Sequence, residues 1–451
     1  GLRAAWAALE ENPGARVAVA STSAGPSGSS FANLHDRLGM QVCFTDTDRA
    51  DLAAEVQAVG RPGHVEPALA EALAADSLAR FEDMRSLGVP FLRGQDGNLA
   101  LFSGCFSPHS RRAVIFEDLG AAFRAFASRI AELGGVFLPG HTVRELLVAD
   151  GAARGAHFVT DDACSIRTIT AQAVIMALGG PAPLFAWSQA GPRNPGWSYA
   201  LLSRAGVRTA NEGFLQYMWA RVPSREFWPL ALRACQGLSV RTPDGGLVPL
   251  PPVLKELAAA RDTHCPFGFG LHDAALDRFL LDQRREDGSV EVFTEAEGTV
   301  RIAPMAHAGN GGALIDEHGR TSLPGLYAAG ECATGMHGAN RIGGAMVLAT
   351  QVFGARAGRH AASSLKKNTH CADTSFTELR ISGEDTDAQA RSEARHKLAL
   401  FLQASVAMHK TPALQAALEQ TRRLRDQAGD WQARLALEAG LTVMNHVASR
   451  N

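Results

Sequence analysis

The amino-acid sequence predicts an α/β fold: a Rossmann-like nucleotide-binding domain, incomplete at its N-terminus, with an inserted α+β cap domain and a C-terminal helical domain. Three observations support this prediction. The chain opens with a helix, a turn and an apolar strand; two later apolar strands end in glycines; and the C-terminal stretch is amphipathic helix. We expect the nucleotide-binding domain to comprise residues 1–214 and 301–365, the cap residues 215–300 and the helical domain residues 375–451.

The opening segment is typical of a βαβ unit that lacks its first strand. A helical face is followed by an Asn-Pro-Gly turn at residues 12–14 and an apolar strand at residues 16–20. The residues of the helical face are Leu2, Ala5, Trp6 and Leu9. The sequence begins with Gly-Leu-Arg rather than Met, so we expect the first strand and its glycine turn to lie upstream, with Gly1 as the last glycine of that turn.

Further along the chain, the pattern of apolar and polar residues changes in the order that the predicted fold requires. Helical spacing of apolar residues predicts packing helices, and an apolar run ended by two glycines predicts a central parallel strand whose end faces a ligand. A Pro-rich, irregular stretch predicts the cap, and a polar stretch predicts a linker. These segments are the helices 65–92 and 119–133, the strand 173–180, the cap 215–300, the linker 366–373 and the helical run 388–447.

Composition limits the classes of function. The 451 residues are 46% hydrophobic and 20% charged, with a formal net charge of −2, which is typical of a globular protein and does not favour binding to nucleic acid. The longest apolar run, residues 169–187, is interrupted by Gln172 and a Gly-Gly-Pro break, so we expect no direct membrane insertion. We expect a cytoplasmic protein, peripheral to the membrane only through a partner.

The seven cysteines are scattered and contain no Cys-x-x-Cys pair. Such spacing argues against a disulfide framework, a metal site and a redox dithiol. We interpret them as reduced thiols of the core.

The residues with the clearest chemistry lie between 307 and 354. The segment 325–331 is a short apolar strand that ends in Gly330 and Glu331, where backbone amides and a carboxylate can meet a phosphate or a sugar hydroxyl. On its own this pattern is more often a turn with a solvated acid. The neighbouring segment 337–344 (HGANRIGG) strengthens it, because its glycine pair opens an apolar helix whose N–H groups favour an electron-rich ligand. Arg341, beside that pair, can bind a carboxylate with two hydrogen bonds.

These motifs resemble the family of the succinate dehydrogenase and fumarate reductase flavoproteins and L-aspartate oxidase. Members carry a strand ending in Gly-Glu, then His-Gly-Ala-Asn-Arg, then a helix beneath the flavin. The segment 304–312 (PMAHAGNGG) is similar to the family's His-Tyr-x-x-Gly-Gly segment. The resemblance implies that His307 and Arg341 hold a substrate carboxylate.

Looser resemblances follow in the same order along the whole chain. Residues 21–31 are similar to the Ser-rich loop that covers the pyrophosphate, residues 177–180 to an Ala-Thr-Gly-Gly strand end, and residues 214–216 to a Phe-x-Gln segment near the cap. The resemblance implies FAD as the cofactor. The residues that it would place against FAD are Gly1, Ser21, Thr22, Ser29, Ser30, Ala177, Gly179, Gly180, Gly330, Glu331, Asn340, Gly343, Gly344, Met346 and Val347.

The sequence departs from the family pattern at the positions that move protons. The His-Pro-Thr segment reads 218–220 (MWA), the Thr-Glu region reads 234–236 (ACQ), and the arginine that shuttles the proton is replaced at 271–273 (LHD). His272 can replace that arginine as an acid, because histidine titrates near neutrality, but a lone loop histidine is more often structural.

Two further departures concern the flavin. The loop 33–36 (NLHD) replaces a family Gly-Gly, so His35 or Asp36 takes part in the site or marks a rearranged loop; we favour the second. Residues 48–59, where membrane-bound members attach the flavin covalently, contain no histidine, so we predict noncovalent FAD.

Two hypotheses of function remain. The first is an FAD-dependent oxidoreductase in which hydride passes between flavin N5 and a small carboxylate-bearing substrate, with electrons exchanged with an iron–sulfur or quinone-linked subunit. The second is a flavin-bearing electron-transfer or assembly subunit without substrate chemistry of its own, which the missing proton relay favours. A nicotinamide–dithiol reductase has little support without a Cys-x-x-Cys pair.

Overall fold

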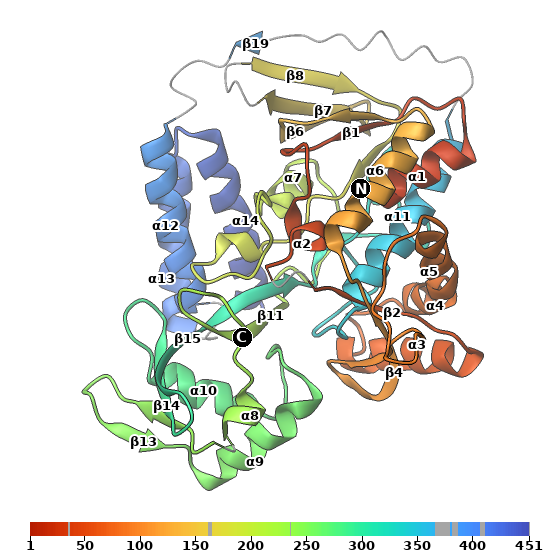
Figure 1. The fold of residues 1–451 in the computed structure, drawn as a ribbon. Helices are drawn as coiled ribbons and strands as arrows, with labels where there is room; N and C mark the ends of the chain where they lie inside the picture. The colour runs from red at the N-terminus through yellow and green to blue at the C-terminus, as the bar shows by residue number, and fades with distance from the viewer. Residues whose placement is uncertain are drawn as a thin grey trace.

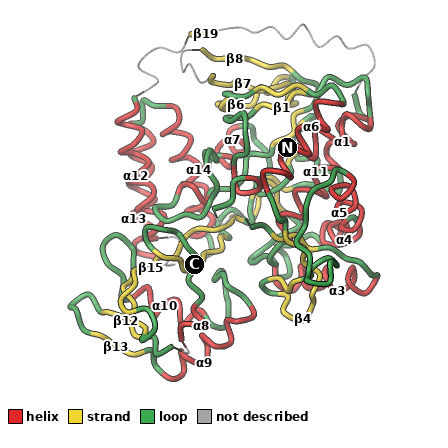
Figure 2. Tube along the Cα trace, in the orientation of Figure 1, coloured by secondary structure: helices red, strands yellow, loops and turns green. Residues whose placement is uncertain are grey.

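The computed structural model describes residues 1–34, 37–160, 165–234, 236–365, 379–380, 387–405 and 411–450. The structure shows three separate regions: the strands and helices of the nucleotide-binding part, an α+β region at one end and a group of C-terminal helices (Figures 1 and 2). The predicted α/β fold with a helical C-terminal part is therefore confirmed. The exact limits of the domains stay a prediction.

The described helices and strands have the following bounds. The helices are α1 (Leu2–Glu11), α2 (Gly28–Phe31), α3 (Asp46–Gly60), α4 (Pro67–Ala75), α5 (Ser77–Ser86), α6 (Leu119–Glu132), α7 (Ser198–Arg204), α8 (Leu230–Ala234), α9 (Pro252–Ala260), α10 (Ala274–Asp282), α11 (Ala345–Ser363), α12 (Ala388–Ser405), α13 (Thr411–Gln427) and α14 (Trp431–Ala448). The strands are β1 (Ala18–Ala20), β2 (Gly39–Gln41), β3 (Phe102–Gly104), β4 (Ser107–Ile115), β5 (Val136–Leu138), β6 (His141–Ala149), β7 (Ala152–Thr160), β8 (Ser165–Thr170), β9 (Val174–Met176), β10 (Thr209–Ala210), β11 (Leu215–Arg221), β12 (Ser239–Arg241), β13 (Leu247–Pro249), β14 (Val290–Thr294), β15 (Gly298–Gly309), β16 (Gly312–Leu314), β17 (Leu326–Ala328), β18 (Ala333–Thr334) and β19 (Leu379–Arg380).

The nucleotide-binding part is built on short parallel strands. β1 pairs with β5 and β9 pairs with β17, each in parallel, and among the described residues the two pairs are not hydrogen-bonded to each other. Helix α1 packs along α11, where Gly358 lies directly against the backbone carbonyl of Ala4. A side chain at position 358 would collide with that backbone, so the glycine permits the close contact between the two helices.

Around these strands lie elements that the sequence only partly revealed. The predicted helix 65–92 is two helices, α4 and α5, which meet at Asp76, and the predicted helix 119–133 is α6. The antiparallel strands β6, β7 and β8, with β19 at the edge, form a separate sheet above the nucleotide-binding part (Figure 1). Its strands were not distinguished in the sequence.

The cap segment, residues 215–300, is α+β as predicted, but its sheet is antiparallel. The order of the strands is β11-β15-β14-β12-β13, and helices α8, α9 and α10 pack beside them (Figure 1). Strand β15 runs across the predicted limit at residue 300 into the segment that contains His307. The sheet thus connects the cap directly to the predicted site.

The C-terminal region consists of α12, α13 and α14, which pack against one another, and α14 also packs against α7. The edge-on contact of Trp197 with Trp431, with ring centroids 5.7 Å apart, joins this region to the loop before α7. The predicted linker at residues 366–373 lies outside the described residues. Among the helices that the structure describes, none has both the length and the apolar character needed to cross a bilayer.

Candidate active site

The carboxyl ends of β9 and β17 lie side by side, as expected for paired parallel strands. The N–H of Ala329 donates to the carbonyl of Met176 at 3.0 Å, and Gly330 follows with a φ of 78°, a conformation that glycine adopts without strain. The Glu331 Oε1 accepts the N–H of Gly309 at 2.8 Å, and its carboxylate lies directly against Gly180. Two strand ends and the end of β15 therefore meet at Glu331.

The Ser-rich loop after β1 is attached to the same region through residues 191–194. The N–H of Gly191 donates to Ser29 Oγ at 3.0 Å, and the hydroxyl of Thr22 donates to the carbonyl of Arg193 at 3.3 Å. Asn194 in turn donates to the carbonyl of Gly180 at 3.3 Å. This chain of contacts brings the two predicted cofactor-binding segments, 21–31 and 177–180, to one side of the fold.

The segment 337–344 is enclosed by three parts of the chain. Gln41 of β2 donates through its side chain to the carbonyl of Gly343 at 2.7 Å. From the cap side, Gln216 donates to the carbonyl of Arg341 at 3.1 Å, and Asn340 donates to the carbonyl of Phe269 at 3.0 Å. Gly344, with a φ of 82°, is the N-cap of α11, so the first-turn N–H groups of that helix begin here.

Most of the predicted cofactor residues are small and at least partly exposed. Ala177 and Gly1 are exposed neighbours. A Cβ added to Gly1 would lie 3.5 Å from the Cβ of Ala177. The partly exposed members are Ser21, Thr22, Ser29, Ser30, Gly179, Glu331, Gly343, Gly344 and Val347. Gly180, Gly330, Asn340 and Met346 are buried beside them. An accessible strip of small residues that ends at a helix N-terminus fits an elongated phosphate-containing cofactor such as FAD.

In the segments 304–312 and 337–344 and in two glutamines that bind the second of them, buried polar atoms of the described residues lack a hydrogen-bond partner. They are Arg341 Nε, His337 Nε2, Asn340 Oδ1, Gln216 Oε1, Gln41 Oε1, and both side-chain polar atoms of Asn310. Native proteins pair nearly all buried polar atoms, so a group of this size in one place indicates a site for a polar ligand. Asn310 and His337 lie in the two segments that carry the family resemblance but were not among the predicted site residues. Gln41 was not singled out, because nothing in its local pattern distinguishes it from a core polar residue.

Burial sets the protonation of this cluster. It lowers the pKa of Arg341, while Glu331 and Cys105 oppose the shift, and it lowers the pKa of His337 to about 3, with Arg341 adding to the effect. His337 is therefore neutral at physiological pH. The guanidinium of Arg341 is a cation with little solvent around it, which favours an anionic ligand.

The two predicted catalytic histidines lie in different settings. His307 occupies the register shift between β11 and β15, where Gln216 pairs with Ala308 and Tyr217 with Ala306. Such a bulge turns a side chain away from the regular pleat. Because Gln216 also holds the backbone of Arg341, this bulge lies close to the arginine in the fold. His272, in contrast, is exposed, and its ring centroid lies 6.5 Å from that of the buried His264. Both catalytic roles stay predictions.

Other candidates lie elsewhere or outside the described residues. His35, Asp36 and Cys235 are not described. A cavity of about 410 Å³ between the loop 183–187 and α12 includes none of the predicted site residues. Among the described residues, no group of three His, Cys, Asp or Glu side chains is arranged to hold a metal ion.

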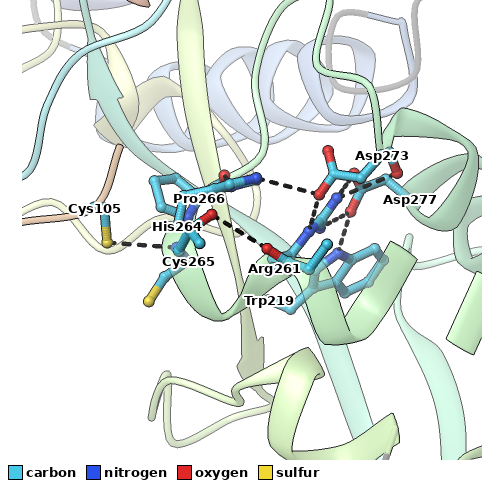
Figure 3. A network of polar contacts seen from close by, with 10 residues as sticks. Cys105, Trp219, Arg261, His264, Cys265, Pro266, Asp273 and Asp277 are labelled. Carbon is cyan, nitrogen blue, oxygen red and sulfur yellow. Dashed lines mark hydrogen bonds and ion pairs between the residues drawn. The ribbon is translucent and has the colours of Figure 1, made fainter. Parts of the chain in front are cut away.

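A buried ion-pair cluster lies in the cap segment (Figure 3). Arg261 binds Asp273 through Nε at 2.7 Å and Asp277 through both terminal nitrogens at 2.5 and 2.6 Å. The Trp219 N–H donates to Asp277 at 2.9 Å, and His264 Nε2 lies 3.3 Å from Asp273. The cluster joins β11, the turn after α9 and helix α10 within the cap segment.

Replacing Glu331 by Gln should flatten the pH dependence of stability of the FAD-free protein. Burial raises the pKa of Glu331, so the native state holds this proton at pH values where the unfolded chain has lost it. Stability therefore falls as pH rises from the ordinary glutamate range through the raised pKa, and the glutamine variant lacks this loss. Thermal unfolding measured across this range checks it. Glu317→Gln, at an exposed glutamate, is the control, and equal slopes in wild type and E331Q would contradict the prediction.

Comparison with known proteins identifies the family of this chain. Residues 1–241 and 260–347 match the family described as FAD binding domain. The chain is 30% identical over 397 residues to L-aspartate oxidase of Caulobacter vibrioides, which covers 80% of this chain and 75% of that protein. It is 25% identical over 435 residues to one subunit of the fumarate reductase (CoM/CoB) of Methanothermobacter marburgensis, covering 86% and 76%.

The fold has a close counterpart among solved structures. The Sdh1 complex of Mycobacterium smegmatis in the apo form matches with a TM-score of 0.75 at 20% identity, over 99% of this chain and 84% of that one. At this identity the likeness concerns the fold. From the family match and the L-aspartate oxidase relative, the chain belongs to the FAD-binding flavoprotein family of L-aspartate oxidase and the succinate dehydrogenase and fumarate reductase flavoproteins.

Proposed function

We propose that this chain is an FAD-dependent oxidoreductase that acts on a small carboxylate-bearing substrate held by Arg341. The observation that carries the proposal is the buried guanidinium of Arg341, whose Nε lacks a partner, beside the accessible Glu331 and Gly343–Gly344. The relatives support it, because aspartate and fumarate, the compounds in their names, are both small dicarboxylates.

The cofactor would occupy the accessible strip. Glu331 is a hydrogen-bond acceptor for a hydroxyl of the cofactor, and the Ser29 and Ser30 loop, Gly179 and the first-turn N–H groups of Met346 and Val347 are donors for its electron-rich groups. FAD supplies the two-electron acceptor or donor of the reaction when it is bound.

The side chains near Arg341 then have separate tasks. The guanidinium binds and orients the substrate carboxylate with parallel hydrogen bonds, and the low water content around it strengthens that interaction. The neutral His337 offers a ring nitrogen to a second polar group of the substrate. His307, on the bulge of β15, is proposed as the second carboxylate ligand. The proton is assigned to the exposed His272, whose side chain would have to turn toward the site.

The experiment that tests this function uses FAD-loaded protein under anaerobic conditions. Aspartate and succinate are added to the oxidised protein, and fumarate to the dithionite-reduced protein, while the flavin absorbance is followed. We expect at least one of these acids to change the flavin redox state. If none does, the substrate is of another class, or the chain lacks substrate chemistry.

We also propose that FAD is bound without a covalent link, because residues 48–59 contain no histidine. Precipitating the FAD-loaded protein with acid should release all yellow colour into the supernatant, where FAD is identified by its fluorescence. Colour that remains in the washed pellet would contradict the proposal.

An electron-transfer partner belongs to the same proposal. The partner would carry iron–sulfur clusters or be linked to quinone; a solved structure of similar fold, a quinol-fumarate reductase with menaquinol molecules, supports the quinone link. A cytoplasmic location, or one at the membrane through that partner, follows from it. The second candidate function is an electron-transfer or assembly subunit, favoured by the tripeptide 218–220 (MWA) where the family carries His-Pro-Thr. Reduction of the flavin by a redox partner but by no small acid would support this second candidate.

A further inference from the structure

The tip of the β3–β4 hairpin, residues 104–107, makes a close contact with residues 263–265 of the cap segment. The N–H of Phe106 donates to the carbonyl of Thr263 at 3.1 Å. The ring of Phe106 stacks on His264, with centroids 4.6 Å apart and an angle of 10° between the planes. The hairpin belongs to the nucleotide-binding part, so this tip contact joins that part to the cap.

Two cysteines meet at the tip contact. The backbone N–H of Cys265 donates to the Sγ of Cys105 at 3.4 Å (Figure 3). Both thiols are free and partly exposed, whereas Cys43 and Cys332 are buried. The sequence has no Cys-x-x-Cys pair, but the fold brings together two thiols that are 160 positions apart.

The surroundings of this pair are well fixed on both sides. The carbonyl of Cys105 accepts the N–H of Gly343 at 2.9 Å, which anchors the hairpin at the start of α11. On the cap side, His264 is held between Asp273 and the carbonyl of Pro266, at 3.3 and 2.9 Å. Because these contacts hold both segments, the proximity of Cys105 and Cys265 is a fixed feature of the fold.

The electrostatics favour Cys105 as the more reactive thiol. The hydrogen bond from Cys265 lowers the pKa of Cys105, with His264 and Arg341 adding positive charge, although burial opposes the shift. The hydrogen bond to Cys105 and burial raise the pKa of Cys265. A thiolate beside a thiol is the arrangement that begins disulfide exchange.

We propose that Cys105 and Cys265 form a reversible disulfide that locks the cap onto the nucleotide-binding part beside Arg341. The oxidant is a low-molecular-weight disulfide. The Cys105 thiolate attacks one sulfur of that disulfide, forms a mixed disulfide and releases one thiolate, which takes up a proton. The Cys265 thiol then loses its proton and attacks the Cys105 sulfur, releasing the second thiol. Counted from the two thiols, with one proton leaving when Cys105 ionises, the protein loses two electrons and two protons, and the small disulfide becomes two thiols.

The disulfide would make the site at Arg341 respond to the balance of thiols and disulfides in the solution around the protein. The new bond closes the chain between residues 105 and 265 and holds the hairpin tip, the cap and Gly343 together. A dithiol reductant reverses it. Intracellular disulfides of mesophilic proteins are usually of this transient or sensing kind.

The test uses the full chain with oxidised glutathione, followed by alkylation and peptide mapping without reduction. We expect a cross-linked pair of peptides containing Cys105 and Cys265, and a loss of two of the seven thiols in denaturant, reversed by dithiothreitol. Hydrogen exchange of residues 104–107 and 263–265 should slow in the oxidised protein. None of these readouts depends on enzyme activity.

Matched variants separate this pair from other thiols. Cys105→Ser and Cys265→Ser should each lose the cross-link, and Cys43→Ser should keep it. The proposal is overturned if the native wild-type protein yields no 105–265 peptide, or if it yields only separate glutathione adducts of the two cysteines. The peptide map of the wild-type protein decides between these outcomes. The test therefore remains valid even if one of the variants fails to fold.

Discussion

Replacing Arg261 by Met should lower the free energy of unfolding by about 3–5 kcal/mol, because it leaves two buried carboxylates without their cation. Arg261, Asp273 and Asp277 are all buried, and the guanidinium makes three hydrogen bonds of 2.5 to 2.7 Å to the two acids. Burial alone would raise the pKa of Asp273, but hydrogen bonds from His264 and Arg261 hold it below its usual range. Asp273 is therefore charged in the native protein and depends on Arg261.

Chemical denaturation at neutral pH measures this loss, and Arg278→Met, at an exposed position of α10, is the matched control. The lowered pKa of Asp273 gives a second check. Its contribution to stability is present above the ordinary aspartate range and is lost as pH falls through the lowered pKa, so the difference between wild type and R261M should shrink in acid. A loss below about 1 kcal/mol, the size typical of an exposed ion pair, would show that the cluster does not hold the cap.

Replacing Arg341 by Met should reduce kcat/KM for the carboxylate substrate by roughly 30- to 4,000-fold, while FAD stays bound. Loss of one partner of a buried, hydrogen-bonded charge pair costs about 2–5 kcal/mol, and about 1.4 kcal/mol corresponds to a factor of ten. Arg341→Lys keeps the charge but cannot make two parallel hydrogen bonds to one carboxylate, so its activity should fall between those of wild type and R341M. Steady-state kinetics at several substrate concentrations provide the measurement.

Stability separates this role from a structural one. The Arg341 guanidinium is buried and its Nε is unpaired, so its removal should not destabilise the FAD-free protein. Arg320→Met, at an exposed arginine paired with Asp316 in an i,i+4 bridge, is the control and should keep full activity. A large loss of stability in R341M, or unchanged kcat/KM, would assign Arg341 to the fold rather than to the substrate.

The sequence predicted those parts of the fold and site that have a local signature. Gly179, Gly330 and Gly344 could be recognised from the sequence, because they follow apolar strands or precede a helix. In the structure each adopts a positive φ. The helical periodicity of residues 388–447 likewise needs no knowledge of distant partners. These features could therefore be located without a structure.

Contacts between distant segments could not be predicted in this way. The order of the cap sheet depends on β11 pairing with β15, some 80 positions later in the chain, and the bulge at His307 follows from that pairing alone. Cys105 and Cys265 lie in unremarkable loops, and only the fold makes them neighbours. Arg261 appears in the sequence as an ordinary charged residue at the end of a helix, yet it is among the most buried cations of the cap.

The central claim is that Arg341 holds a carboxylate next to FAD at the start of α11. It is tested most directly by a crystal structure of the FAD-loaded protein with a small dicarboxylate such as malonate. We predict the flavin ring beside Gly343 and Gly344 and one carboxylate of the ligand paired with the guanidinium of Arg341. A flavin placed away from the accessible strip, or a dicarboxylate bound elsewhere with Arg341 still unpaired, would contradict the account.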